Sequence, residues 1–261
     1  MQQLLIKHKD KVYDNNSFNF IVSKKDVPDM PTSTIMSDEI PYSSKKVIYR
    51  REDGTRIIPV SIYFKHEYLN ELNKNINDLN NLLKDEIVLK FNDNPYSYIC
   101  NLIDFSQENI IDMHKIYTLT FETTDAYRYS WQKSNEELSW EWAYENIGIN
   151  RREPTIYNIT SNTTIKCDNF GNYPAKPIVK IQGTCNNITI GGMTYNASIT
   201  DNLTIDTEKE ICYRDNNGNI ENKRQNLSGE FLIIIPGENE ISITGSNMNL
   251  TLELIYRHTY R

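Results

Sequence analysis

Histidine, cysteine and long apolar runs are scarce in this sequence of 261 residues. It contains four histidines and four cysteines, and none of them form a CxxC or HExxH motif. P-loop, GxSxG and GxGxxG motifs are also absent. The sequence therefore lacks the spacings typical of zinc proteins, nucleotide-binding proteins and common hydrolases. We expect no enzyme activity, no cofactor and no metal site.

Two further absences concern membranes and secretion. No window approaches the ~20 apolar residues that a bilayer-spanning helix requires. Residues 1–7 contain only a short apolar run, without the apolar core and cleavage site of a signal peptide. We therefore expect a soluble protein, made in a cytosol, that does not insert into membranes.

The charged residues are numerous but mixed in sign. The net charge is −7, and lysines and arginines are interleaved with acids, as in Lys84-Asp85-Glu86. Nucleic-acid binding needs basic residues gathered on one face, so we expect none. The cysteines are expected to be buried thiols, with a disulfide among Cys167, Cys185 and Cys212 left open.

Residues 1–130 are predicted to form a mixed α+β domain with one helix. Apolar residues recur every three or four positions from Leu69 through Leu72, Ile76 and Leu79 to Leu83, which predicts a helix at about 67–84 packed on a sheet. Strands are predicted on both sides of it, at 4–13, 18–23, 47–50, 58–64, 86–91, 96–104 and 115–124.

Turn residues indicate how the early strands connect. Asp53-Gly54 is typical of a tight turn, so the strands at 47–50 and 58–64 are expected to form a hairpin. The strands at 4–13 and 18–23 are expected to pair with each other around a polar break. Residues 26–46 hold three prolines and little periodicity, which favours an extended arm over core structure.

Residues 131–154 show no strand periodicity and are predicted to be the linker between two domains, with a short helical turn inside it. This segment contains all three tryptophans, Trp131, Trp140 and Trp142. Aromatic faces pack against the apolar surface of sugars, so these tryptophans are candidates for stacking on a glycan. The alternative is that they are buried at the domain junction.

The last part of the chain, residues 155–261, is predicted to be an all-β sandwich. Short strands separated by turn clusters are expected at 178–182, 188–190, 193–199, 203–206, 211–214, 231–235, 241–244 and 250–257. Asp215 to Asn219 faintly resembles a calcium loop, but Gly218 is misplaced for one and a hairpin turn is expected. Tyr195 and Tyr213 are the aromatic residues expected in exposed loops.

A set of short motifs occurs in a distinctive order along nearly the whole chain. They are Tyr49-Arg50-Arg51-Glu52-Asp53-Gly54 followed by Arg56, then residues 89–96, Thr120-Phe121, Asn172-Tyr173-Pro174-Ala175-Lys176-Pro177, and residues 188–192, 203–206 and 235–241. In this order and spacing the sequence resembles the distal tail proteins of long-tailed phages that infect Gram-positive bacteria.

That resemblance implies a virion structural protein at the phage tail tip, synthesised in the host cytoplasm. Such proteins form a hexameric ring between the tail tube protein and the tail-tip or receptor-binding proteins. Their N-terminal domain is a β-barrel or sandwich with one helix and an arm that reaches the neighbouring subunit. Their C-terminal domain is a galectin-like or carbohydrate-module-like sandwich. The alternative function is an adhesion module that recognises host cell-wall glycan, and weak glycan contact is left open.

Overall fold

The computed structural model of the chain describes residues 2–9, 11–40, 44–65, 68–111, 114–136 and 155–261. The chain divides into two units, Met1–Trp131 together with Arg261, and Gln132–Tyr260. No helix among the described residues is both long and apolar enough to cross a bilayer.

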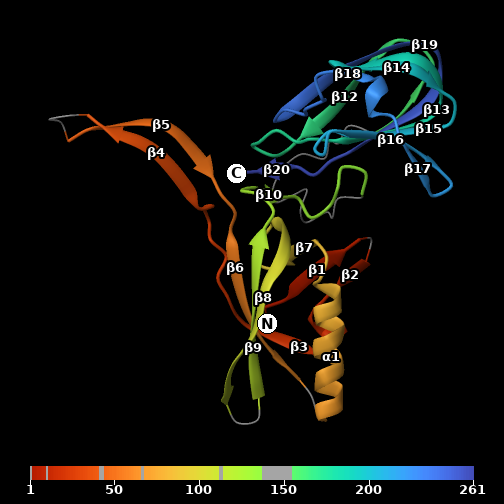
Figure 1. The fold of residues 1–261 in the computed structure, drawn as a ribbon. Helices are drawn as coiled ribbons and strands as arrows, with labels where there is room; N and C mark the ends of the chain where they lie inside the picture. Colours follow the sequence, from red (N-terminus) through yellow and green to blue (C-terminus); the bar gives the residue numbers. More distant parts are fainter. Residues whose placement is uncertain (1, 10, 41–43, 66–67, 112–113, 137–154) are drawn as a thin grey trace. The chain divides into compact units, whose positions relative to one another are not determined.

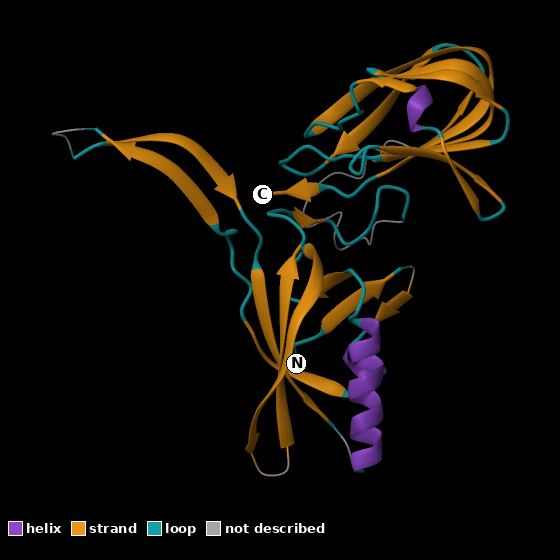
Figure 2. Cartoon of the chain, viewed as in Figure 1, coloured by secondary structure: helices purple, strands orange, loops and turns teal. Residues whose placement is uncertain are grey.

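An antiparallel sheet with the strand order β2-β1-β7-β8-β9-β6-β3 forms the first unit, and β10 extends β8 (Figures 1 and 2). Its strands are β1 (Leu4–His8), β2 (Lys11–Tyr13), β3 (Phe20–Lys25), β6 (Ile57–Phe64), β7 (Ile87–Phe91), β8 (Ser97–Ile111), β9 (His114–Thr123) and β10 (Arg128–Tyr129). A separate two-stranded sheet pairs β4 (Ser33–Glu39) with β5 (Lys46–Asp53).

The core of this unit lies between the sheet and helix α1 (Leu69–Leu82), which runs beside the sheet in Figure 1. Strand β6 alternates as the sequence predicts, and its buried face consists of Ile58, Val60, Ile62 and Phe64. Each such side chain contributes about 1.5–3 kcal/mol when fully buried. The predicted α+β class is confirmed.

The helix shows one departure from the predicted apolar stripe. Leu72, Leu79 and Leu83 are buried as predicted, but Leu69 is 67% exposed. Leu82, which was not part of the predicted stripe, is buried at the other end of the helix. Leu69 is the first residue of the helix, after the N-cap Tyr68, so it lies beyond the part of the helix that packs on the core. Of the expected span 67–84, residue 67 lies outside the described residues.

Two predicted strand pairings in the first unit are wrong. Residues 4–13 are a hairpin of β1 and β2, with Lys9 at a φ of 55° in the turn. The polar break after it folds into the 3₁₀ helix η1 (Asn15–Phe18), which Asp14 caps. The following strand, β3, therefore pairs with β6 and not with β1.

The second error concerns the arm. We expected β5 and β6 to form a hairpin through Asp53-Gly54, but β5 pairs with β4, while β6 pairs with β3 and β9. Residues 26–46 also contain a regular strand, β4, so the arm is a hairpin that continues to Asp53. In Figure 1 this hairpin leads away from the rest of the first unit.

In the second unit, the described residues form strands and one short 3₁₀ helix, η2 (Arg224–Asn226). Its strands are β11 (Ile156–Ile159), β12 (Thr163–Asn169), β13 (Ile178–Ile190), β14 (Met193–Ile199), β15 (Asn202–Asp206), β16 (Ile211–Asn216), β17 (Asn219–Asn222), β18 (Leu227–Gly229), β19 (Gly237–Ile255) and β20 (Thr259–Tyr260). The main path runs β11-β19-β13-β15-β16-β17, while β12 pairs with β19, and β14 joins β13 to β18.

Two long strands, β13 and β19, organise this unit by changing partners along their length. The first half of β13 pairs with β15, and its second half pairs with β14. Bulges between Thr184 and Thr189 mark the change. Gly183 lies just before them with a φ of 126°, and a Cβ there would lie 2.3 Å from the carbonyl oxygen of Asn249. Bulges let a strand pass from one layer of a sandwich to the other.

Several strands predicted in this unit are joined or absent. The segments 178–182 and 188–190 are both parts of β13, and 241–244 and 250–255 are both parts of β19. Residues 231–235 form no strand, and only Ile234 makes an isolated bridge, with Ala175. The Asp215 to Asn219 segment is the predicted hairpin turn, in which Asn217 and Gly218 have φ angles of 51° and 89°.

Candidate assembly surface

The arm is a ribbon of two strands without a buried face. All residues of β4 are exposed, and so are all residues of β5 except Asp53. The two strands pair from Ser33 with Asp53 to Glu39 with Lys46, and a bulge occurs at Tyr49. A lone hairpin of this kind is only marginally stable in water, so this element gains most from a partner surface.

Exposed apolar side chains gather on the arm and just before it. They are Met30, Ile35, Met36, Ile40, Val47, Ile48 and Tyr49, each between 40% and 67% exposed. Paired residues share a face, so Met36 and Val47 lie on one face of the ribbon, and Ile35 and Ile48 lie on the other. Contiguous exposed apolar surface is typical of a protein–protein contact.

Polar contacts hold the ribbon together at intervals. Lys46 Nζ lies 3.2 Å from Glu39 Oε1 near the tip, and Arg50 pairs with Glu52 at 2.5 Å. The side chains of both pairs are largely exposed to solvent, so each pair contributes little to stability. Of these two pairs, Lys46 with Glu39 joins β5 to β4 and so acts on the register of the hairpin, whereas Arg50 and Glu52 both lie on β5.

The arm joins the sheet through a tightly packed root. The Gly54 N–H donates to the Thr32 carbonyl oxygen over 2.6 Å, and a Cβ on Gly54 would come within 2.6 Å of the Thr32 hydroxyl. The Thr32 hydroxyl in turn donates to the Thr55 carbonyl oxygen. Glycine fits this close approach without moving the Thr32 side chain, which accounts for the glycine in the Asp53-Gly54 motif.

Arg56, the last residue of that motif, is buried at 1% exposure. Its backbone exchanges hydrogen bonds with Thr123, and its Nη1 donates to the Ala126 carbonyl oxygen. Burial lowers the pKa of the Arg56 guanidinium, while the nearby Tyr98, Asp125 and Asp53 raise it. Arg56 therefore ties the start of β6 to the segment that follows β9.

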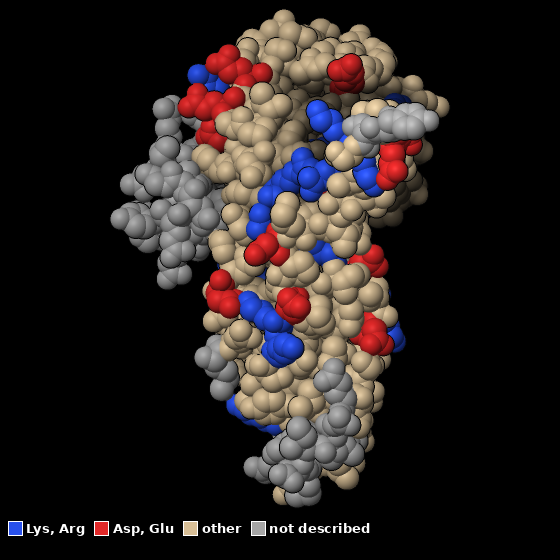
Figure 3. Space-filling view, turned by 90° about the vertical axis from the view of Figure 1, so that its left-hand side faces the viewer, with Lys and Arg blue, Asp and Glu red and all other residues tan. Residues whose placement is uncertain are grey.

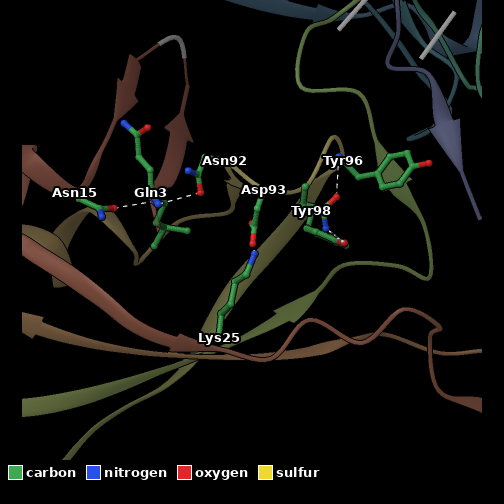
Figure 4. A network of polar contacts seen from close by, with 9 residues as sticks. Gln3, Asn15, Lys25, Asn92, Asp93, Tyr96 and Tyr98 are labelled. Atoms are coloured by element: carbon green, nitrogen blue, oxygen red, sulfur yellow. Dashed lines mark hydrogen bonds and ion pairs between the residues drawn. The ribbon is translucent and has the colours of Figure 1, made fainter. Parts of the chain in front are cut away.

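The motif at residues 92–96 forms a pinned loop (Figure 4). Gln3 and Asn92 exchange two hydrogen bonds of 3.1 Å. Lys25 pairs with Asp93 and lies 4.4 Å from the ring centre of Phe91. Asn94 accepts from the Tyr96 N–H over 2.9 Å and donates to the Tyr98 hydroxyl over 3.1 Å. The motif is explained by these contacts, which are structural.

Of the three candidate glycan-stacking residues, only Trp131 is among the described residues. It is partly buried, and Lys90 Nζ lies 6.0 Å from its ring centre. Trp140 and Trp142 lie outside the described residues, as does most of the predicted linker and its helical turn. Tyr195, expected in an exposed loop, is instead buried on β14, and Tyr213 is half-buried on β16.

The four cysteines and two of the histidines, His8 and His258, have defined surroundings in the structure. All four cysteines are free and buried, so the disulfide left open by the sequence is not formed. His8 Nε2 lies 3.0 Å from Asp85 Oδ2, and the buried His258 accepts from the Phe170 N–H at Nδ1. Among the residues that the structure describes, no group of His, Cys, Asp and Glu could hold a metal ion.

Charges on the face drawn in Figure 3 are mixed. Lysine and arginine side chains and aspartate and glutamate side chains both occur on it, in small separate groups among a larger neutral surface. This distribution matches the interleaving seen in the sequence and the net charge of −7. It differs from the continuous basic face that binds nucleic acid.

The sequence predicted an arm at residues 26–46, but it did not predict that β5 also belongs to the arm. The signal was Val47-Ile48-Tyr49, an apolar run directly after the expected arm. Such a run favours a strand, and we assigned it to the body of the domain. The exposed apolar residues of β5 are therefore the functional candidates that the sequence did not single out.

Comparison with solved structures identifies the fold. The crystal structure of the Dit protein of phage SPP1 matches with a TM-score of 0.64 at 12% identity, over 99% of both chains. The chain has the Dit fold. The SPP1 protein is presented as a paradigm of the hub adsorption apparatus of phages that infect Gram-positive bacteria. No family model and no curated protein matches the sequence.

Structures of the phage p2 baseplate share the Dit fold. Two of them, in the activated conformation with strontium or with calcium, match with a TM-score of 0.58 at 13% identity over 98% of both chains. The likeness spans both units and includes nearly every residue of each chain. The resemblance to distal tail proteins that the sequence motifs suggested is thus confirmed in the fold.

Proposed function

We propose that this chain is a structural protein of a phage tail tip, assembled through its arm into a closed ring. The ring, with six copies as the resemblance implies, connects the tail tube to the host-contacting proteins. The protein would then belong to the virion and would perform no catalysis. Its fold supports the tail-tip role, because structures that share it over nearly their whole length include a phage hub protein and a phage baseplate.

The exposed apolar ribbon carries the proposal of assembly. A monomer gains nothing from a two-stranded arm whose apolar side chains face water on both sides. A closed ring needs a contact between two different surfaces of each copy, because head-to-tail contacts generate rings. An arm that reaches the next copy supplies one of those surfaces, and an open strand edge or apolar face supplies the other.

The two units take separate roles in this proposal. Residues 1–130 form the ring, 131–154 are the linker, and 155–261 form a sandwich on the outside. The arm begins and ends in the first unit, at Thr32 and Gly54. Receptor-binding or tail-associated proteins would attach to the assembled ring and not to the single chain.

Removal of the arm tests the proposal. Thr32 and Gly54 are joined by a hydrogen bond of 2.6 Å, so residues 33–53 can be replaced by two glycines without stretching the chain. The shortened protein should be folded, with an unchanged circular dichroism spectrum, and monomeric by light scattering. The unmodified protein should have the mass of a ring. A shortened protein that still forms the full oligomer would rule out assembly through the arm.

Glycan recognition remains a prediction of the sequence alone. The one described candidate, Trp131, is partly buried beside Lys90, and this arrangement does not favour a sugar platform. Co-sedimentation with host cell walls tests the idea. Binding that weakens in Trp140→Ala and Trp142→Ala, with Trp131→Ala as comparison, would establish an adhesion role beside the structural one.

A further inference from the structure

The root of the arm contains a set of charged groups that are incompletely paired. Asp53, the last residue of β5, has a side chain that is 13% exposed, and its Oδ2 pairs with Arg261. Its other oxygen, Oδ1, is buried without a hydrogen bond, and it forms an ion pair with Arg51 Nε at 3.4 Å. This oxygen therefore has a long ion pair with Arg51 but accepts no hydrogen bond.

Arg56 has buried donors that lack acceptors, which complements the unbonded carboxylate oxygen of Asp53. It is 1% exposed, and its Nη1 donates to Ala126, but its Nε and Nη2 are buried without a hydrogen-bond partner. Leaving charged donors unpaired in the interior costs more free energy than any other polar burial. Nε and Nη2 lie on one edge of the guanidinium, which is an edge that a carboxylate can bind with both oxygens.

Asp53 and Arg56 are separated only by Gly54 and Thr55, and the charge of Asp53 already acts on Arg56. If the end of β5 shifts toward the sheet, the Asp53 carboxylate can accept hydrogen bonds from Nε and Nη2 of Arg56. Because Asp53 is part of the arm and Arg56 belongs to the body, such a shift is a change in the direction of the arm. The pairing with Arg261 opposes it.

We propose that Asp53 is a latch with two positions at the root of the arm. It pairs with Arg261 in the free chain, and it passes to Arg56 when the arm engages a second copy. The idea rests on the proposed ring, since the second copy supplies the energy for the exchange. The latch gives the arm two defined directions instead of a continuous range of directions. When the arm engages a second copy, the bidentate pair of Asp53 and Arg56 offsets part of the entropy lost on ordering the arm.

The latch can be tested on the isolated full chain, at concentrations where copies do not associate. Spin labels on Ser37→Cys in the arm and Asn101→Cys on β8 report the arm's direction as a distance by pulsed electron paramagnetic resonance. Both positions are exposed, and the four native cysteines are buried, so labels attach where intended. Arg214→Met, which removes an ion pair with Asp201 in the second unit, is the matched control.

Releasing Asp53 with Arg261→Met should shift the distance distribution to a second, equally narrow population. Adding Arg56→Met to that variant should abolish the shift. Arg56→Met alone should leave the distance unchanged, because Asp53 pairs with Arg261 in the free setting. If this variant does not fold, Arg56→Lys, which keeps a charge but not the two-pronged geometry, takes its place.

Two results would overturn the latch. One is an Arg261→Met distribution identical to that of the unmodified chain and the Arg214→Met control. The other is a shift caused by Arg56→Met alone, which would make Arg56 a support of the free setting. Both results can be obtained without ring formation. A chain that never forms rings would refute the proposed function, but it would not change the distances between the spin labels.

Discussion

The Tyr49 hydroxyl on β5 donates a hydrogen bond of 2.9 Å to Asp38 Oδ2 on β4, across the arm. Tyr49 lies at the bulge in the hairpin, between the pairs that join Met36 to Arg50 and Ser37 to Ile48. The bond to Asp38 raises the pKa of the Tyr49 phenol. The arm is thus organised before it meets a partner, and this reduces the entropy that binding has to overcome.

Charge placed on the exposed face of the arm should abolish assembly without unfolding the chain. Ile48 on β5 is 61% exposed, and Ile220 on β17 in the second unit is 58% exposed. We expect Ile48→Asp to give monomers and Ile220→Asp to give rings, in both cases with stability changed by less than about 0.5 kcal/mol. Sedimentation velocity and urea titration provide the two readouts. Equal loss of assembly in both variants would show that the arm is not special.

Gly183 should be essential for the second unit. Its φ of 126° and the 2.3 Å between a Cβ and the Asn249 carbonyl oxygen leave no room for a side chain. Gly183→Ala should destabilise the unit by about 1–3 kcal/mol. Gly192→Ala, where the nearest atom to a Cβ lies at 3.7 Å and φ is not positive, is the control. Thermal unfolding followed by circular dichroism distinguishes them, and equal melting temperatures would contradict the account of this corner.

The cap of η1 predicts a dependence on pH. Asp14 accepts from the Ser17 hydroxyl and from the backbone N–H groups of Asn16 and Ser17, and these bonds hold its pKa below the ordinary 3.8. The stabilisation is complete above the unfolded pKa and is lost as pH falls through the folded pKa. Urea midpoints between pH 7 and pH 3 should therefore fall less steeply in Asp14→Asn. Parallel curves for the two proteins would refute this role.

The four cysteines should be inert in the folded chain. Burial raises the pKa of Cys167 to about 12 and that of Cys212 to about 11, and it also raises the pKa of Cys100 and Cys185. Thiolate is the reactive form, so Ellman's reagent at pH 8 should label native protein slowly and all four thiols after denaturation. Rapid labelling of even one thiol in the native protein would show that its burial is not maintained.

The elements that the sequence predicted correctly are those with one face in a core. Strand β6 and helix α1 bury apolar residues at a regular period, so their type could be read directly. Leu69 was wrongly predicted to be buried, because the periodicity of a helix does not show where the surface on which it packs ends.

The pairing of strands was harder to predict, because it depends on residues far apart in the sequence. Asp53-Gly54 is a strong local signal for a turn, yet the contact of Gly54 with Thr32 turns the chain out of the arm instead of into a hairpin with β6. The arm carries no period-two pattern of burial, because both of its faces are exposed. Its register is set by local polar pairs, and these have no clear signature in a sequence so rich in charge.

The most direct test of the account is the shape and mass of the purified full-length protein. Negative-stain microscopy should show rings with a central hole, and mass photometry should give six times the chain mass of 30.6 kDa. The variant lacking residues 33–53 should show only single chains at the same concentrations. Monomers of the full-length protein at every concentration, or rings that persist without the arm, would contradict the central claim.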